Sequence, residues 1–531
     1  MYRLHFSQRW FFPLVILISI LSGCGTGSDH SSNPGTIDPQ LQQALRSLKP
    51  SDPVKIIVYM ADGADLSVIS DQNITVRREK VVQALRDKAS RLHGTVLAHL
   101  SGVAAQRVTQ LWIANAVAAT VRADQVAQIA ALTGIDTVAL DAEIPMPITS
   151  YGSSTIVSSG SSTIVSFGTS TAPGWNVTAL RAPDLWNLGY TGQGVVVANM
   201  DTGVLASHPS LTTRYRGGTN SWKDVTIEHY AAPTDIDGHG TMTMGLMVAG
   251  SEIGAPLGAA PGAKWIAVKI AYRQTIPYVR TVFDLSSVHA AFQWLLDPDN
   301  NPATNDAPDV VNASWGLSTI GCDAQKQFLA DIQALKAANI AIVFAAGNFG
   351  TSGNASPQNY AESFSVGSVD VTYTIEALSS RGPSACTGNI FPNVVTPGRD
   401  VTTTFSNGLY AVTTNGGTSY AAPQAAGAMA LLLSAFPGQF VSNLETALQQ
   451  TATDLGTTGP DNTYGYGLVN ALNAYHFLHR SPISVNQDGL WYIDANGNGI
   501  WDGVPIDALY DFGKGQGSII PRSVIGTAQV R

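Results

Sequence analysis

The stretch NGGTSYAAPQAAGAMALLLSAF, residues 415–436, places one hydroxyl among residues that have almost no side chain. The segment from Pro423 onward is apolar on most faces, which predicts a helix buried in the core of a domain. Pro423 fits near the start of such a helix, because the first N–H groups of a helix have no partners inside it. Ser419 therefore lies where a glycine turn enters a buried helix, with N–H donors pointing toward its hydroxyl. That position suits a nucleophile, and it equally suits a serine that caps the helix.

Around this helix, residues 175–480 alternate apolar runs with helical segments. The apolar runs are continuous, which is typical of strands covered on both faces; they are GVVVANM (194–200), KWIAVKI (264–270), DVVNASW (309–315) and IAIVFAAG (340–347). Helical segments between them include SSVHAAFQWLL (286–296) and AQKQFLADIQALKAAN (324–339). This order predicts an α/β domain with a doubly wound, mostly parallel sheet, whose sites lie at the carboxyl ends of the strands.

Polar residues stand at several of these ends. Asp201 follows the strand in VVVANMDTGV, His239 lies in the glycine-flanked turn of DIDGHGTMTMG, and Asn348 closes IVFAAGN. Taken singly, they are a turn residue, a packed loop histidine and a tight-turn amide. Together with Ser419 they supply an orienting carboxylate, a base, a donor for an oxyanion and a nucleophile.

The segments MDTGV, DGHGTMTMG, AAGN and GGTSYAAPQAAG resemble the four signature motifs of the subtilisin-like (subtilase) serine peptidases, in that family's chain order. The resemblance covers about residues 175–475. It implies that Ser419 is the nucleophile, His239 its general base, Asp201 the residue that orients the imidazole, and Asn348 a side-chain donor to the oxyanion. It implies protein or peptide substrates and no cofactor for catalysis.

The same resemblance suggests where substrate binds. SWG, residues 314–316, matches the segment that lines the cleft in the family, so Ser314, Trp315 and Gly316 are expected to bind substrate backbone. NASPQNY, residues 354–360, resembles the floor of the S1 pocket and places Ala355 at its bottom. No acid stands there, which favours an apolar or mixed P1 side chain, and we expect the bulk of Trp315 to narrow the cleft.

The start of the chain carries export features. Residues 1–23 combine a basic beginning with the short apolar run FFPLVILISIL, and LSGC, residues 21–24, resembles the bacterial lipobox in which Cys24 is lipidated. An ordinary signal peptide with a chance cysteine is the alternative. Lipidated Cys24 would attach the chain to a membrane before processing, and the mature enzyme is expected in the periplasm or outside the cell.

Three segments separate Cys24 from the α/β domain. Residues 24–52 begin as a Gly/Ser/Pro-rich run and are expected to be a tether. Residues 53–143 show a compact pattern of strands and amphipathic helices that resembles the family's inhibitory propeptide, an intramolecular chaperone and inhibitor. Residues 144–174 are of low complexity, with GSSTIVSS nearly repeated as GSSTIVSF, and are expected to form a linker.

The tail, residues 481–531, is rich in Gly and Asp and is expected to be a small module. Asp494, Asn496, Asn498 and Asp502 follow the spacing of a Ca²⁺-binding loop around a glycine, but the twelfth position is proline, so a solvated β-turn is an equal alternative. Of the three cysteines, Cys322 and Cys386 suit either one disulfide or two free thiols. The net charge of −9 argues against nucleic acid as a partner.

Other functions fit less well. An inactive, lipid-anchored binding protein or adhesin on the same fold would not need all four site residues. An α/β-hydrolase requires G-x-S-x-G, whereas position 421 is alanine. Sedolisins share the glycine-threonine-serine motif but use a Glu/Asp pair in place of histidine, which the contexts of Asp201 and His239 exclude. We therefore expect a secreted serine endopeptidase that is made as a self-processing zymogen.

Overall fold

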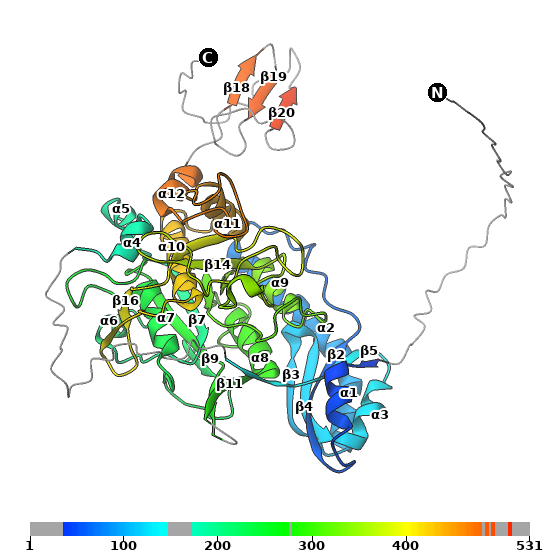
Figure 1. Ribbon diagram of the computed structural model, residues 1–531. Coiled ribbons are helices and arrows are strands. Elements are labelled where there is room, and N and C mark those ends of the chain that lie inside the picture. The colour runs from blue at the N-terminus through cyan, green and yellow to red at the C-terminus, as the bar shows by residue number, and fades with distance from the viewer. Residues whose placement is uncertain are drawn as a thin grey trace, which may run out of the picture.

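The computed structural model describes residues 35–146, 172–275 and 279–479, together with three short strands of the tail. An N-terminal unit, residues 35–146, packs on a larger main unit, residues 172–479 (Figure 1). Within these described ranges, no helix is both long enough and apolar enough to cross a membrane.

The core of the main unit is a seven-stranded sheet in the order β15-β14-β13-β12-β7-β9-β8, and every neighbouring pair is parallel. The predicted doubly wound α/β fold is confirmed. The strands are β7 (Val196–Asp201), β8 (Trp222–Asp224), β9 (Lys264–Lys269), β12 (Val310–Ala313), β13 (Ala341–Ala345), β14 (Phe364–Val369) and β15 (Val394–Pro397).

Helices cover both faces of this sheet because alternate side chains along each strand point to opposite faces. Val197 of β7 packs in the cluster that contains α10 (Thr418–Ala435) and α7 (His239–Val248), whereas the next residue, Ala198, packs in the cluster of α8 (Leu285–Leu296) and α9 (Leu329–Ala337). The apolar residues of α10 are buried along nearly its whole length, as its composition predicts. The carboxyl ends of the strands and the start of α10 therefore meet inside one packed unit.

Shorter elements complete the main unit. They are α4 (Trp175–Ala179), α5 (Ala182–Asn187), α6 (Pro209–Thr212), β10 (Tyr272–Gln274), β11 (Arg280–Asp284), the 3₁₀ helix η3 (Gly350–Ser352), β16 (Thr402–Thr404), β17 (Tyr410–Val412), α11 (Val441–Gln450) and α12 (Ala471–His479).

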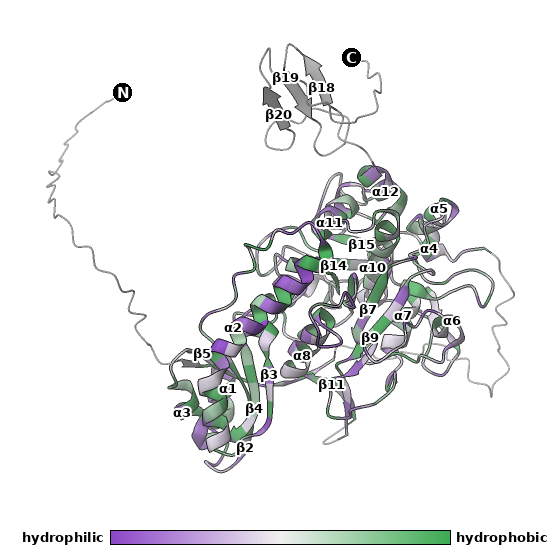
Figure 2. Cartoon of the chain, turned by 180° about the vertical axis from the view of Figure 1, so that it is seen from behind, coloured by the Kyte–Doolittle hydropathy of each residue, from purple (hydrophilic) through white to green (hydrophobic). Residues whose placement is uncertain are grey.

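The N-terminal unit is a five-stranded sheet in the order β1-β5-β2-β4-β3 with helices packed against it. Its elements are β1 (Thr36–Ile37), α1 (Pro39–Leu45), β2 (Pro53–Met60), α2 (Ile74–Gly102), β3 (Gln106–Leu111), η1 (Trp112–Ala114), β4 (Ala116–Arg122), η2 (Ala123–Gln125), α3 (Val126–Ala130), β5 (Ile135–Leu140) and β6 (Glu143–Pro145). Figure 2 shows polar and apolar residues interleaved along the long helix α2, which suits a helix with one face on a protein surface.

Two expected boundaries need correction. The tether was placed at residues 24–52, but β1 and α1 already belong to the folded unit: Asp38 caps α1 through the N–H groups of Gln40 and Leu41, and Leu41 is fully buried. The linker was placed at 144–174, but Ile144 and Pro145 belong to β6. In both places a short strand pairs with a strand that is distant in the sequence: β1 pairs with β5, and β6 pairs with β11.

The N-terminal unit docks on α8 and α9. Asp141 accepts hydrogen bonds from the backbone N–H and the hydroxyl of Ser286, in the first turn of α8, at 2.9 and 2.7 Å. Tyr59 of β2 bonds to His289 of α8 at 3.0 Å, with His289 fully buried and Tyr59 partly buried. The guanidinium of Arg78, on α2, donates hydrogen bonds to backbone carbonyls of the main unit, including that of Pro308 at 3.0 Å. Apolar residues of the unit, including Ile57, Val82 and Leu85, also pack in one buried cluster with side chains of α8 and α9, so the interface is both polar and apolar.

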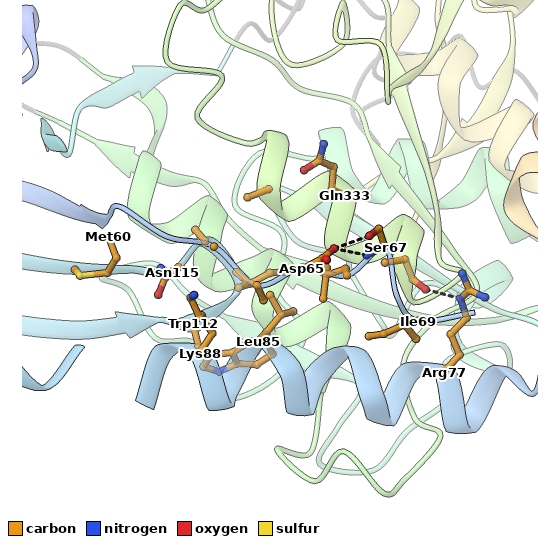
Figure 3. A pocket seen from close by; sticks show the side chains of 17 residues that line it. Met60, Asp65, Ser67, Ile69, Arg77, Leu85, Lys88, Trp112, Asn115 and Gln333 are labelled. Carbon is orange, nitrogen blue, oxygen red and sulfur yellow. Dashed lines mark hydrogen bonds between the residues drawn. The ribbon is translucent and has the colours of Figure 1, made fainter. Parts of the chain in front are cut away.

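A pocket of about 680 Å³, open to solvent, lies between the two units beside these contacts. Figure 3 shows α2 along one side of it, with the side chains of Asp65, Lys88 and Trp112 from the N-terminal unit, and Gln333 of α9 also lines it. The two units therefore leave a groove beside the packed part of their interface.

The tail contributes a small antiparallel sheet of β18 (Ser484–Gln487), β19 (Leu490–Ile493) and β20 (Ala508–Asp511). Asp494, Asn496, Asn498 and Asp502, the residues of the calcium hypothesis, lie outside the described residues, as does Cys24. Those assignments stay predictions from the sequence.

Cys322 and Cys386 form a disulfide, which decides between the two alternatives left open by the sequence. The bond joins the segment before α9 to the loop after β14, across a sequence separation of 64 residues. Such a cross-link stabilises a protein mainly by restricting its unfolded chain.

Replacing both cysteines with serine should lower the free energy of unfolding by about 2–4 kcal/mol, because the unfolded chain gains freedom when the cross-link is lost. Urea unfolding of the two proteins, with the activity blocked by Ser419→Ala in each, measures the difference. Wild-type protein should resist alkylation of both thiols before reduction. Rapid alkylation of Cys322 and Cys386 without a reductant would contradict the disulfide.

Candidate active site

Asp201 and His239 form the central contact of the site. Asp201 is the last residue of β7 and His239 the first of α7, so the strand end and the helix start bring them together. Nδ1 of His239 lies 2.8 and 3.1 Å from the two carboxylate oxygens of Asp201, and both side chains are 1% exposed. Two hydrogen-bonded polar groups this deeply buried hold a single relative orientation.

The environment of His239 favours its protonated form. Burial alone would lower the pKa of the imidazole, but the charge of Asp201 and its hydrogen bond outweigh burial, and the pKa is raised above the ordinary value of 6.5. Nε2, the other ring nitrogen, is buried and has no hydrogen-bond partner among the described residues. With Nδ1–H directed at Asp201, Nε2 is the nitrogen left to accept a proton.

Asp235, which the sequence analysis did not single out, shapes the loop that leads into His239. Its carboxylate accepts hydrogen bonds from the backbone N–H groups of Gly238 and Thr241, both at 2.8 Å, and from the hydroxyl of Thr202. Burial raises the pKa of Asp235. The sequence could have indicated this role, because Asp235 lies four residues before His239 and Asp commonly accepts hydrogen bonds from nearby N–H groups in turns.

Ser419 lies in the first turn of α10, 3% exposed. Its hydroxyl donates to the backbone carbonyl of Ser314 at 3.4 Å, and no direct hydrogen bond joins it to His239. The ring of the next residue, Tyr420, has its centroid 6.0 Å from that of His239, so the two helix starts are neighbours. Long nucleophile–base contacts are common before substrate binds.

A buried chain of hydrogen bonds also connects these two helix starts. Asn199 of β7 donates to the carbonyl of Gly240 at 2.9 Å, and Asn312 of β12 donates to Asn199 at 2.9 Å and to Ser314 at 3.0 Å. Ser314 then donates to the backbone carbonyl of Ser419 at 2.9 Å. The sequence analysis missed Asn199 and Asn312, although polar residues inside apolar strands were a visible signal.

Asn348 follows β13 and faces the same turn. Its side-chain oxygen accepts from the N–H of Thr418 at 3.1 Å and from the Thr418 hydroxyl at 3.0 Å. Its Nδ2 group has no partner among the described residues, and neither has the backbone N–H of Ser419. The arrangement therefore presents two N–H donors beside one hydroxyl.

The four expected substrate-binding residues divide into two groups. Ser314 and Gly316 lie beside the site: Ser314 bonds to Ser419, and Gly316 is covered by the side chain of Gln358. Ala355 is fully buried and lies three residues before that glutamine in the sequence. Gln358 is 2% exposed with an unpartnered Oε1, and the sequence analysis did not identify it.

The expected role of Trp315 as a bulky wall of the cleft is wrong. Its indole is 2% exposed and packs against the rings of four residues of the core: Phe283, Phe292, Phe328 and Phe344. Because successive residues of an extended chain point to opposite sides, the side chain of Trp315 faces the core while its neighbours face the site.

One acidic cluster outside the site has the donors for a metal ion. Carboxylate oxygens of Asp297, Asp299 and Asp306 lie within 4.8 Å of one another in the part of the chain that the structure describes. The guanidinium of Arg86, from α2, donates to Asp297 at 2.5 Å and to Asn300 at 2.6 Å. An arginine therefore already supplies positive charge to this cluster.

Comparison with known proteins identifies the family of the chain. A model of the subtilase family matches residues 192–467, just over half of the sequence. The chain belongs to the subtilase family. This subtilase is 31% identical to subtilisin BL of Lederbergia lenta over 297 residues, which are 56% of this chain and 96% of that protein. It is 36% identical over 324 residues to bacillopeptidase F of Bacillus subtilis (strain 168), but the match spans only 22% of that longer protein.

A third relative, subtilisin E of the same Bacillus subtilis strain, is 32% identical over 300 residues, 56% of this chain and 69% of that protein. The matched region holds the parallel sheet, α7 and α10. The chain is thus a subtilisin-like serine peptidase, a serine endopeptidase that acts on proteins or peptides.

In the subtilase, His239 should titrate with a midpoint above 6.5, and Asp201→Asn should lower that midpoint, because the negative charge that stabilises the imidazolium is removed. NMR of ¹³C-labelled histidine in the Ser419→Ala background measures both. His208 is the internal control, since burial lowers its pKa and its ring bonds to the Leu409 carbonyl. An unchanged His239 midpoint in Asp201→Asn would contradict this account.

Proposed function

We propose that Asp201, His239 and Ser419 form a catalytic triad with Asn348 as an oxyanion donor, in a zymogen that is exported and processes itself. The observation that carries the proposal is the buried Asp201–His239 pair. Nε2 of His239 has no hydrogen-bond partner among the described residues, and the start of the helix that holds His239 lies beside the start of the helix that holds Ser419. Buried, hydrogen-bonded ionisable groups at the ends of parallel strands are candidates for a reaction centre.

The chemistry follows from the atoms available. The Ser419 oxygen attacks the carbonyl carbon of the scissile peptide, and Nε2 of His239 takes the hydroxyl proton. The negative charge that develops on the carbonyl oxygen is bound by the backbone N–H of Ser419 and by Nδ2 of Asn348, the two donors that have no other described partner. His239 then gives its proton to the leaving amine, and water releases the acyl group by the same steps in reverse order. These side chains supply every proton transfer without a cofactor.

The N-terminal unit is proposed to be the inhibitory prodomain. Its last strand, β6, pairs antiparallel with β11 at the edge of the main unit, and the N–H of Met146 continues the pairing to the carbonyl of Thr281 at 3.0 Å. A segment that adds a strand in this way occupies the position that a bound peptide would take. The chain leaves β6 toward the proposed cleavage region, residues 147–174.

The interface combines polar contacts with a shared apolar core. Asp141–Ser286 and Tyr59–His289 fix the orientation of the unit. Ile57, Val82 and Leu85 of the unit pack in one buried cluster with apolar residues of α8 and α9. Such a surface suits a prodomain that guides the folding of α8 and α9.

Export and lipidation complete the proposal. A diacylated Cys24 would anchor the precursor, because each buried CH₂ contributes about 0.8 kcal/mol to membrane binding. The anchor lies on the prodomain side of residues 147–174, so cleavage there separates the peptidase from the membrane. Calcium binding by the tail rests on the spacing of its Asp and Asn residues.

Ser419→Ala should abolish hydrolysis of casein, with kcat reduced by roughly 10⁶-fold, the scale known for this change in subtilisin itself. Asn348→Ala should reduce kcat by only about 10²–10³-fold, because one of two oxyanion donors is lost. Fluorophosphonate labelling should mark Ser419 in wild type and in Asn348→Ala. Undiminished proteolysis by Ser419→Ala would overturn the triad, and an unlabelled wild type would favour an inactive binding protein.

Maturation should release the peptidase from the membrane. In a bacterial host, the Ser419→Ala precursor should stay full length in the membrane fraction, while the wild-type main unit becomes soluble because it cuts its own linker. A Cys24→Ser variant controls for the lipid and should be soluble whether or not it is cleaved. Mature wild-type enzyme still joined to Cys24 through an intact chain would refute this scheme.

A further inference from the structure

Glu376 is a buried carboxylate that the proposed reaction does not use. It follows β14 in the chain, its residue is 7% exposed, and its own N–H bonds to the carbonyl of Ser368 at 2.9 Å. Its side chain accepts hydrogen bonds from the Ser368 hydroxyl and from the backbone N–H of Gly417 at 2.8 Å. Gly417 stands two residues before the nucleophile, so this carboxylate contacts the turn that presents Ser419.

The turn fits closely around the carboxylate. Gly416 and Gly417 have φ values of +64° and +137°, a backbone conformation that favours glycine. A Cβ added to Gly416 would overlap the Glu376 carboxylate, which shows how closely the two groups approach. A change in the position of the Glu376 oxygens would therefore be transmitted directly to the glycine turn.

Two N–H groups at the start of α10 have a defined side-chain partner. The N–H of Gly417 is bound by Glu376, and that of Thr418 is bound by the side-chain oxygen of Asn348. The N–H of Ser419 is the next along the chain and has no described partner. Two acceptors thus fix the two peptide groups that set the direction of the Ser419 N–H.

The surroundings of Glu376 shift its pKa in both directions. Burial raises the pKa of Glu376, while the bonds from Ser368 and Gly417 and the charge of Arg399 lower it, and Asp370 raises it further. Arg381 donates to the backbone carbonyl of Glu376 at 2.8 Å, not to its carboxylate. A negative charge beside a developing oxyanion is unfavourable, whereas an acceptor oxygen in the same place holds the turn whether the group is charged or neutral.

We propose that Glu376 is a positioning residue for the oxyanion site: its side-chain oxygen holds the Gly417 N–H and thereby aims the Ser419 N–H at the transition state. This inference rests on the proposed function of Ser419 and Asn348. The position of the acceptor oxygen is the essential feature, and the negative charge is not.

Two conservative substitutions separate position from charge. Glu376→Gln keeps an acceptor oxygen at the same distance along the side chain and removes the charge, whereas Glu376→Asp keeps the charge and withdraws the oxygens by one methylene. In the full-length protein, we expect Glu376→Asp to lower kcat for a peptide amide by about tenfold with KM within about twofold, since one aligned hydrogen bond is lost in the transition state. Glu376→Gln should retain most of the wild-type kcat.

A peptide boronic acid gives a second readout, because its adduct with serine places an oxygen in the oxyanion site. Its affinity should fall in Glu376→Asp by the same factor as kcat and stay near wild type in Glu376→Gln. The matched control is Glu445, a partly buried glutamate whose pKa is also raised by burial and which pairs with Lys336 at 2.9 Å. Glu445→Asp and Glu445→Gln should change the melting temperature without changing kcat or boronate affinity.

The opposite ranking, with Glu376→Gln impaired and Glu376→Asp active, would overturn the proposal in favour of a role for the charge. Equal kcat in wild type and Glu376→Asp would also overturn it, as would losses in kcat that match those of the Glu445 pair. Ser419→Ala, measured in parallel, distinguishes failure of the proposed triad from failure of the proposed role of Glu376. An active Ser419→Ala refutes the triad itself, whereas an inactive Ser419→Ala beside an unaffected Glu376→Asp refutes only the role of Glu376.

Discussion

The burial of α10 is the constraint on which the rest of this structure depends. The helix packs against β12, β13, β14 and β15 on the sheet and against α7 beside it. At one point the approach leaves no room for a side chain: a Cβ added to Gly427 would lie 2.7 Å from the Cβ of Ala259. A helix held this tightly has a fixed first turn, and Ser419 is in that turn.

Because the start of α10 is buried, its N–H groups need partners from the protein. Glu376 and Asn348 provide two of them, and the N–H of Ser419 is left over. An unpaired donor in a buried turn is unfavourable for folding, but in the proposed reaction it is ready to bind an oxyanion without prior rearrangement. The hydrogen bonds through Asn199, Asn312 and Ser314 hold this turn beside the start of α7. The peptidase site is thus built from hydrogen bonds that also satisfy two helix termini.

The N-terminal unit is attached to the main unit through both apolar and polar contacts. One face of its sheet has its own apolar core, with residues such as Ile56, Val58 and Val138 fully buried. The other face, which includes Ile57, shares a buried cluster with α8 and α9. The Asp141–Ser286 hydrogen bonds and the pairing of β6 with β11 add polar contacts, so the unit is held in one orientation on the main unit.

The sequence by itself determined the class of fold and indicated the candidate site residues. Continuous apolar strands predict a parallel sheet, and the positions of Asp201, His239, Asn348 and Ser419 at strand and helix ends place them on one edge, because parallel strands end on the same side. The motifs around them were specific enough to indicate a subtilase, which the family match confirms. These features depend on short-range patterns that the order of residues records directly.

Only the tertiary structure decided which residues support those groups. Glu376 is 41 residues from Gly417, and Asn312 is 113 from Asn199, and nothing in their local sequence marks them as partners. Trp315 was assigned to the cleft because of its neighbours, whereas its side chain faces the core. The pairing of Cys322 with Cys386 and the docking of β1 against β5 were equally undecided by sequence. The physical reason is common to all five: side-chain direction and long-range contact arise from packing, which the order of residues alone does not specify.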